Sequence, residues 1–125
     1  MKLIDVVMAH IAAEEMSSLN WPYDLALALV KVKRATADET AFFVSKERAL
    51  ALEYAALDEF GNMRLTPRGT FIFKEPSKAD EYERVRRELA DTDAGEHPPA
   101  FRVKPPTEIR PAWVEALEGF IEFSG

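Results

Sequence analysis

The chain contains 125 residues, of which 47% are apolar and 30% charged, and it carries a net charge of −6 at pH 7. This size and composition predict one globular domain, residues 1–125, with a modest hydrophobic core. The acidic balance argues against a general binder of nucleic acid or anionic membranes. Because the sequence has no cysteine, disulfides, thiolate metal sites and a cysteine nucleophile are excluded.

The N-terminal sequence Met1-Lys2-Leu3-Ile4-Asp5 lacks the pattern of a signal peptide. No apolar run approaches the roughly 18 residues of a membrane span. We therefore expect a cytoplasmic protein that makes no contact with membranes.

The first predicted element is a short amphipathic helix that ends near Met16. Its apolar residues recur at helical spacing, at Leu3, Ile4, Val7, Met8 and Ile11. Residues 17–20 are polar or small for the most part and form the connector to the next element.

The stretch from Pro22 to Phe60 has no internal glycine or proline and predicts one long central helix. Proline suits a first helical turn, and Gly61 suits the position after a helix end. Two alternatives stay open. Residues 25–32 alternate partly as a strand would, and a capping-box pattern from Thr36 would break the helix near Ala35. We favour one helix because leucine and alanine, which dominate its start, are strong helix formers.

The remaining elements are shorter. Residues 63–65 and 70–74 flank a Thr-Pro-Arg-Gly turn and predict a hairpin, after which a helix begins at Ser77. Residues 101–104 alternate as a strand. A last helix begins at Pro111, and its buried face is expected to contain Trp113, Leu117, Phe120 and Ile121.

These elements predict an α+β fold that is predominantly helical, with a long central helix and a small two- or three-stranded sheet. Since so few short strands are not stable alone in water, the sheet is expected to pack on helices. We find no internal repeat and no domain boundary in the sequence.

Five pieces of the sequence occur in a recognisable order: Leu19–Pro22, Glu47-Arg48, Tyr54, Asp58–Asn62 and Pro111–Leu117. This order resembles a family of short phage and prophage proteins of unknown function. In that family a short helix and a Leu-Pro-type step lead into a long charged helix, followed by a turn, a small strand region and a C-terminal helix. The resemblance implies a phage or prophage gene product and brings no catalytic residues.

Catalytic chemistry has little support in the sequence. The two histidines, His10 and His97, belong to no metal-binding pattern, and the paired carboxylates are adjacent residues that point in different directions on a helix. We therefore expect no enzyme activity, no cofactor and no metal. A small-molecule binder or enzyme with a pocket near His97 or Tyr54 is kept as a further alternative.

Aromatic and large apolar residues are the candidates for contact with another protein. They are Phe42, Phe43, Leu50, Trp113, Phe120 and Phe123. Phe42 and Phe43 point about a hundred degrees apart on a helix, so one of them is expected to leave the buried face. A helix of this length has more surface than the short elements can cover, which predicts a homo-oligomer or a phage or host protein partner.

Basic residues offer an alternative, a regulator that associates with nucleic acid through Arg64, Arg68, Arg84, Arg86 and Arg87. Acidic residues are interleaved with these arginines, which favours surface ion pairs instead. The leading hypothesis is a non-enzymatic accessory protein that acts through protein–protein contacts.

Overall fold

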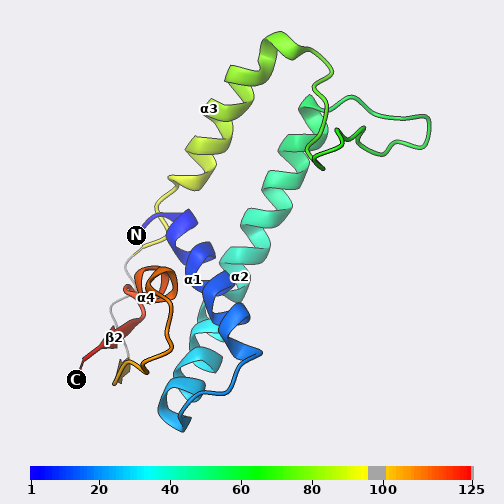
Figure 1. The fold of residues 1–125 in the computed structure, drawn as a ribbon. Helices are drawn as coiled ribbons and strands as arrows, with labels where there is room; N and C mark the ends of the chain where they lie inside the picture. Colours follow the sequence, from blue (N-terminus) through cyan, green and yellow to red (C-terminus); the bar gives the residue numbers. More distant parts are fainter. Residues whose placement is uncertain (96–100, 125) are drawn as a thin grey trace. The chain divides into compact units, whose positions relative to one another are not determined.

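The computed structural model describes residues 1–95 and 101–124. The chain divides into two compact units: unit 1 contains residues 1–41 and 92–125, and unit 2 contains residues 42–91. The long helix α2 (Tyr23–Tyr54) contributes to both units. The predicted fold class, a mainly helical α+β fold with a long helix, is confirmed (Figure 1). Within the described residues, no helix is both long and apolar enough to cross a membrane.

Helix α1 (Leu3–Ser17) begins where Asp5 accepts a hydrogen bond from the backbone N–H of Lys2, at 3.1 Å. The predicted buried face was partly wrong, because Met8 and Ile11 are exposed. Besides Leu3 and Val7, which are buried as predicted, the buried face contains Val6, Ala9, Ala12, Ala13 and Met16.

Helix α2 is continuous, so the alternatives of a strand at residues 25–32 and a break near Ala35 are wrong. Thr36 does not cap a new helix. Its buried hydroxyl donates to the carbonyl of Val32, four residues earlier, at 2.7 Å. The helix ends at Tyr54 and not at Phe60, because the next residues bond to segments later in the chain.

The C-terminal part of unit 1 is a strand–helix–strand element. Strand β1 (Phe101–Val103) pairs in parallel with β2 (Ile121–Phe123), with Phe101 opposite Ile121, and α4 (Pro111–Leu117) connects them. The predicted last helix was therefore too long, since Ile121 belongs to a strand. Helix α4 packs on α1, as Figure 1 shows. The two-stranded sheet shares one core with α1 and the first part of α2, consistent with the rule that it needs helical support.

Unit 2 contains a ring of hydrogen bonds among three short segments, residues 54–57, 62–65 and 70–73. Ala56 N–H donates to the Ile72 carbonyl at 2.7 Å, Ile72 N–H donates to Arg64 at 2.8 Å, and Arg64 N–H donates to Ala56 at 2.8 Å. Isolated antiparallel bridges connect the same segments in pairs. The predicted hairpin between residues 63–65 and 70–74 is thus present as a single bridge, and the chain after α2 supplies a third segment.

The ring repeats with a period of eight residues, at Ala56, Arg64 and Ile72, although no internal repeat was predicted from the sequence. Two equivalent turns leave the ring, and each contains a glycine at positive φ, Gly61 at 80° and Gly69 at 84°. Positive φ is accessible to glycine at little cost because it has no Cβ. In the first turn Asp58 accepts hydrogen bonds from the backbone N–H groups of Phe60 and Asn62, which fixes the loop.

Helix α3 (Ala79–Ala90) follows a 3₁₀ turn (Pro76–Lys78), so the predicted start at Ser77 was slightly early and Ser77 forms no side-chain cap. Tyr82 is the buried residue of this helix and the centre of an aromatic cluster. Its ring lies 5.6 Å from Tyr54, 5.1 Å from Phe71 and 5.5 Å from Phe73, all edge-to-face. Each such aromatic pair contributes about 0.5–1.5 kcal/mol beyond the burial of its surface. The aromatic cluster therefore attaches the three-segment hydrogen-bonded ring to α3.

Candidate functional site

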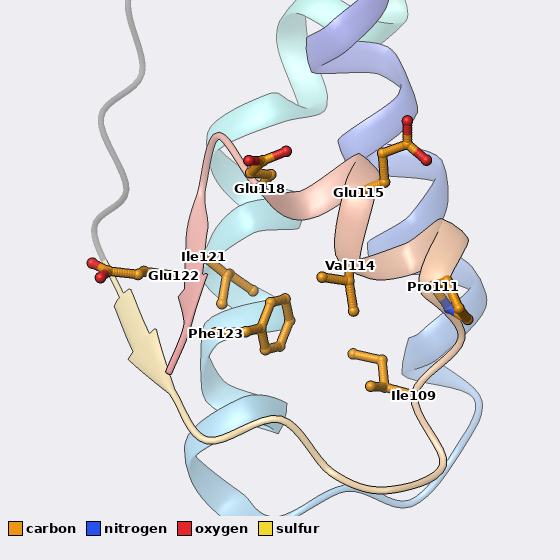
Figure 2. Close-up of a pocket in the computed structure, with 8 residues that line it drawn as sticks. All are labelled: Ile109, Pro111, Val114, Glu115, Glu118, Ile121, Glu122 and Phe123. Carbon is orange, nitrogen blue, oxygen red and sulfur yellow. The ribbon is translucent and has the colours of Figure 1, made fainter. Parts of the chain in front are cut away.

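Unit 1 has a pocket beside α4 and β2, with a volume of about 660 Å³. It is lined by Ile109, Pro111, Val114, Glu115, Glu118, Ile121, Glu122 and Phe123. Figure 2 shows the side chains of Ile109, Val114 and Phe123 facing a common space. The pocket therefore has an apolar floor that is open to solvent.

Local structure explains why these side chains reach the surface. Pro111 begins α4, where its missing N–H is not needed. Trp113 and Leu117 then take the buried face of the helix, which leaves Val114, Glu115 and Glu118 on the outer side. In β2 the side chains alternate, so Ile121 is buried while Glu122 is exposed.

The charged groups of the pocket are all carboxylates. Glu122 is engaged by Arg102 of the neighbouring strand, with the Arg102 Nε 3.2 Å from Glu122 Oε2. Glu115 and Glu118 are exposed, and within the described residues neither has a cation within 4 Å. Among the residues that the structure describes, no lysine or arginine lines the pocket. The rim is consequently negative at neutral pH.

Unit 2 has a second groove, of about 540 Å³, between the end of α2, the three-segment ring and α3. Its apolar residues include Val44, Ala51, Met63, Leu65, Phe71 and Phe73. Its charges are mixed, since Arg86 Nε lies 3.0 Å from Glu47 Oε2 across the groove lining. This groove therefore has no strong net charge of its own.

The residues predicted to contact another protein differ in how far they are exposed. Phe43 is buried and Phe42 is half exposed, as the helical geometry required, while Leu50 is partly buried. Trp113 and Phe120 belong to the core of unit 1 and are not surface residues. Phe123 packs against that core and also lines the pocket.

Trp113 holds α4 in place. Its indole Nε1 donates to Glu15 Oε2 at 3.0 Å, and its ring meets Trp21 edge-to-face at 6.0 Å. The guanidinium of Arg110 covers the ring at 4.8 Å from its centre. These contacts position the pocket-bearing helix against α1 and the connector before α2.

The five arginines of the nucleic-acid alternative are exposed, but two of them are paired with acids. Arg86 contacts Glu47, and Arg84 lies 3.8 Å from Glu88 one turn later on α3. These pairs agree with the interpretation of a solvated helix surface. Arg64 and Arg68 lie on the three-segment ring and on the turn after it.

His10 is a packing residue. Its Nδ1 lies 2.9 Å from Thr36 Oγ1, and because the threonine hydroxyl donates to the Val32 carbonyl, the imidazole must be the donor of this bond. Glu14 Oε1 lies 3.5 Å from the other ring nitrogen. Thr36 is fully buried, so no substrate could reach its hydroxyl. His97 lies outside the described residues.

Tyr54 lines a small polar cavity of about 190 Å³ together with Glu53, Lys74, Glu75, Lys78 and Glu81. Burial and the nearby carboxylates of Glu81 and Glu53 raise the pKa of the Tyr54 phenol. The phenol is therefore neutral at physiological pH and unsuited to act as a base. Among the described residues, no group of three or more His, Asp or Glu side chains is placed to hold a metal ion.

Except for Phe123, the residues that form the pocket floor and rim were not predicted from the sequence as site residues. Ile109, Val114, Glu115 and Glu118 gave no distinctive signal, because their role depends on where α4 ends and β2 begins. Phe60 was also misread as the end of a helix. It lies in an exposed turn and has 80% of its surface accessible.

Comparisons with protein-family models, with curated proteins and with solved structures return no significant match.

Proposed function

We propose that this chain is a non-enzymatic accessory protein of the phage or prophage type, which acts in the cytoplasm through protein–protein contacts. The observation that carries the contact function is the pocket beside α4 and β2, whereas the phage or prophage context rests on the resemblance in sequence. It combines an apolar floor with a charged rim, which is the arrangement found at protein interfaces. Residues of the floor remain accessible although a core lies directly behind them.

The rigidity of the pocket supports a role in binding. Its floor is carried by α4 and β2, and both elements are attached to the core through Leu117 and Ile121, which are almost fully buried. A preformed surface loses little conformational entropy when it binds. The pocket is therefore suited to receive a side chain from a partner without rearrangement.

Self-association is part of the proposal. Helix α2 has exposed apolar residues in unit 2, among them Phe42, Val44 and Leu52. An isologous contact between two copies would cover such a surface. Light scattering across a concentration range tests this point, and a strictly monomeric protein would contradict it.

Capture from cells tests the contact function. The native protein and a Val114→Ser variant are expressed at equal levels, cross-linked and purified, with Phe60→Ser as the control for loss of one exposed apolar residue elsewhere. We expect a defined partner protein with the native chain and the control, and a clear loss with Val114→Ser. Equal capture by all three proteins would contradict the assignment to this pocket.

The pocket volume also favours a second candidate, a small-molecule binder, because pockets of roughly 300–1,000 Å³ accept such ligands. A thermal-shift screen with metabolites would support it if a compound raised the melting temperature of the native protein and not of Val114→Ser.

A further inference from the structure

We infer that the pocket beside α4 and β2 binds a basic segment of a partner protein that inserts a bulky apolar side chain between Ile109, Val114 and Phe123. This inference rests on the proposed function and adds the chemistry of the partner. Two independent features of the pocket carry it, the apolar floor and the sign of the charges around it.

The floor requires an apolar anchor. Ile109 and Phe123 are partly buried against the core of unit 1, and Val114 is partly buried without being part of that core. All three keep accessible surface that faces the same space (Figure 2). A large apolar side chain placed there would remove this surface from water, and such buried anchors commonly dominate binding energy.

The rim selects positive charge. Glu115 and Glu118 are three residues apart across the end of α4 and so share one side of its axis. Both are exposed, and within the described part of the chain neither forms an ion pair. A lysine or arginine that followed the anchor in a partner would find two carboxylates and, among the described residues that line the pocket, no competing cation.

The charge of the whole unit acts in the same direction. Unit 1 contains seven Lys and Arg residues against twelve Asp and Glu residues, whereas unit 2 contains nine against ten. The negative charge of the protein is therefore concentrated on the unit that carries the pocket. Such a field increases the association rate of basic partners and opposes acidic ones.

The groove of unit 2 provides a contrast within the same chain. Its acid Glu47 is already paired with Arg86, and Arg48 and Glu83 add one charge of each sign. A basic segment that bound there would have to displace Arg86 from Glu47, and it would therefore gain no net ion pair. Charge complementarity therefore assigns the basic partner to the pocket of unit 1.

Three synthetic peptides test the inference. They share one apolar sequence centred on a tryptophan and differ only in their polar positions, which are lysine, glutamine or glutamate. Binding is measured by fluorescence anisotropy at low and moderate salt, and the site is mapped by amide chemical shifts. We expect the lysine peptide to bind most tightly, to weaken as salt rises, and to shift the resonances of α4 and β2.

Two double variants distinguish the local effect of the rim carboxylates from the effect of the net charge of the protein. Glu115→Gln with Glu118→Gln should weaken the lysine peptide by roughly three- to tenfold, the effect of losing two exposed ion pairs. Asp80→Asn with Glu83→Gln removes the same charge at the same spacing from α3 and should change the affinity little. Val114→Ser should weaken all three peptides.

The outcomes separate this inference from the proposed function. If the glutamine or glutamate peptide bound the pocket as tightly as the lysine peptide, the basic partner would be wrong while the contact function stood. Equal losses in the two double variants would also overturn it, since the lysine peptide would then respond to net charge alone. If no peptide bound but cellular capture still depended on Val114, the inference would fail and the proposed function would survive.

Discussion

The two glycines of the turns in unit 2 allow a quantitative test of the three-segment ring. Gly61 and Gly69 have φ values of 80° and 84°, and a Cβ built on either would meet no atom within 4 Å. Substitution by alanine therefore introduces backbone strain without a steric clash. The left-handed conformation costs an alanine about 1–2 kcal/mol. Part of this cost, about 0.4–1 kcal/mol, is offset because alanine also restricts the unfolded chain.

We therefore expect Gly61→Ala and Gly69→Ala each to lower the free energy of unfolding of unit 2 by about 1 kcal/mol. Asparagine tolerates the left-handed region better, so Gly61→Asn should cost less than Gly61→Ala. Amide hydrogen exchange reports the effect directly, through the N–H groups of Ala56, Arg64 and Ile72 that close the ring.

Gly95 supplies the matched control. It has a φ of 81° and equally open surroundings, but it belongs to unit 1. Gly95→Ala should introduce the same strain and leave the exchange of the ring amides unchanged. Unchanged exchange in both Gly61→Ala and Gly69→Ala would refute the ring. Equal acceleration by Gly95→Ala would mean that the two units unfold together, as the prediction of a single domain implies.

Three further predictions follow from the packing. Leu117→Ala should destabilise the protein by about 2–5 kcal/mol, because Leu117 is fully buried. Val114→Ala on the same helix should cost less than about 1.5 kcal/mol, because Val114 is only partly buried. Urea unfolding measures both changes. Thr36→Val should lower the free energy of unfolding by about 1–3 kcal/mol, because it removes the acceptor of the hydrogen bond that the His10 imidazole donates. A variant as stable as the native protein would contradict that hydrogen bond. Burial raises the pKa of Tyr82, and burial together with nearby carboxylates raises the pKa of Tyr54. Near pH 10 the tyrosines of the unfolded chain begin to ionise, whereas the folded state keeps both phenols protonated. Stability should therefore fall as pH rises above about 10, and less steeply in Tyr54→Phe with Tyr82→Phe, which denaturation at several pH values would show.

Local signals in the sequence were sufficient to predict that helices α1 to α4 exist, but not where each of them ends. The strong helix formers of residues 25–32 outweighed their partial alternation, and α2 is continuous. Trp113 and Leu117 were correctly placed on one buried face. The turn at residues 66–69 was also correct, because its proline and glycine positions determine the backbone locally.

Elements that depend on distant partners were not predictable in the same way. Residues 55–57 continue the helical pattern of α2, yet Ala56 bonds to Ile72 and Arg64, and no local property of alanine indicates this. Ile121 falls at helical spacing from Leu117 but pairs with Phe101, twenty residues earlier in the chain. Since the pocket lies where α4 gives way to β2, an error in that boundary concealed most of the site.

The most direct test of the account places a photo-cross-linking amino acid at position 114 in the intact protein in cells, with the exposed position 60 as the control. A partner that uses the pocket should form a discrete adduct from position 114, and the cross-linked peptide of the partner should contain Lys or Arg close to a large apolar residue. Adducts of equal yield from both positions, or none from position 114, would contradict the claim that the pocket beside α4 and β2 is where this protein meets its partner.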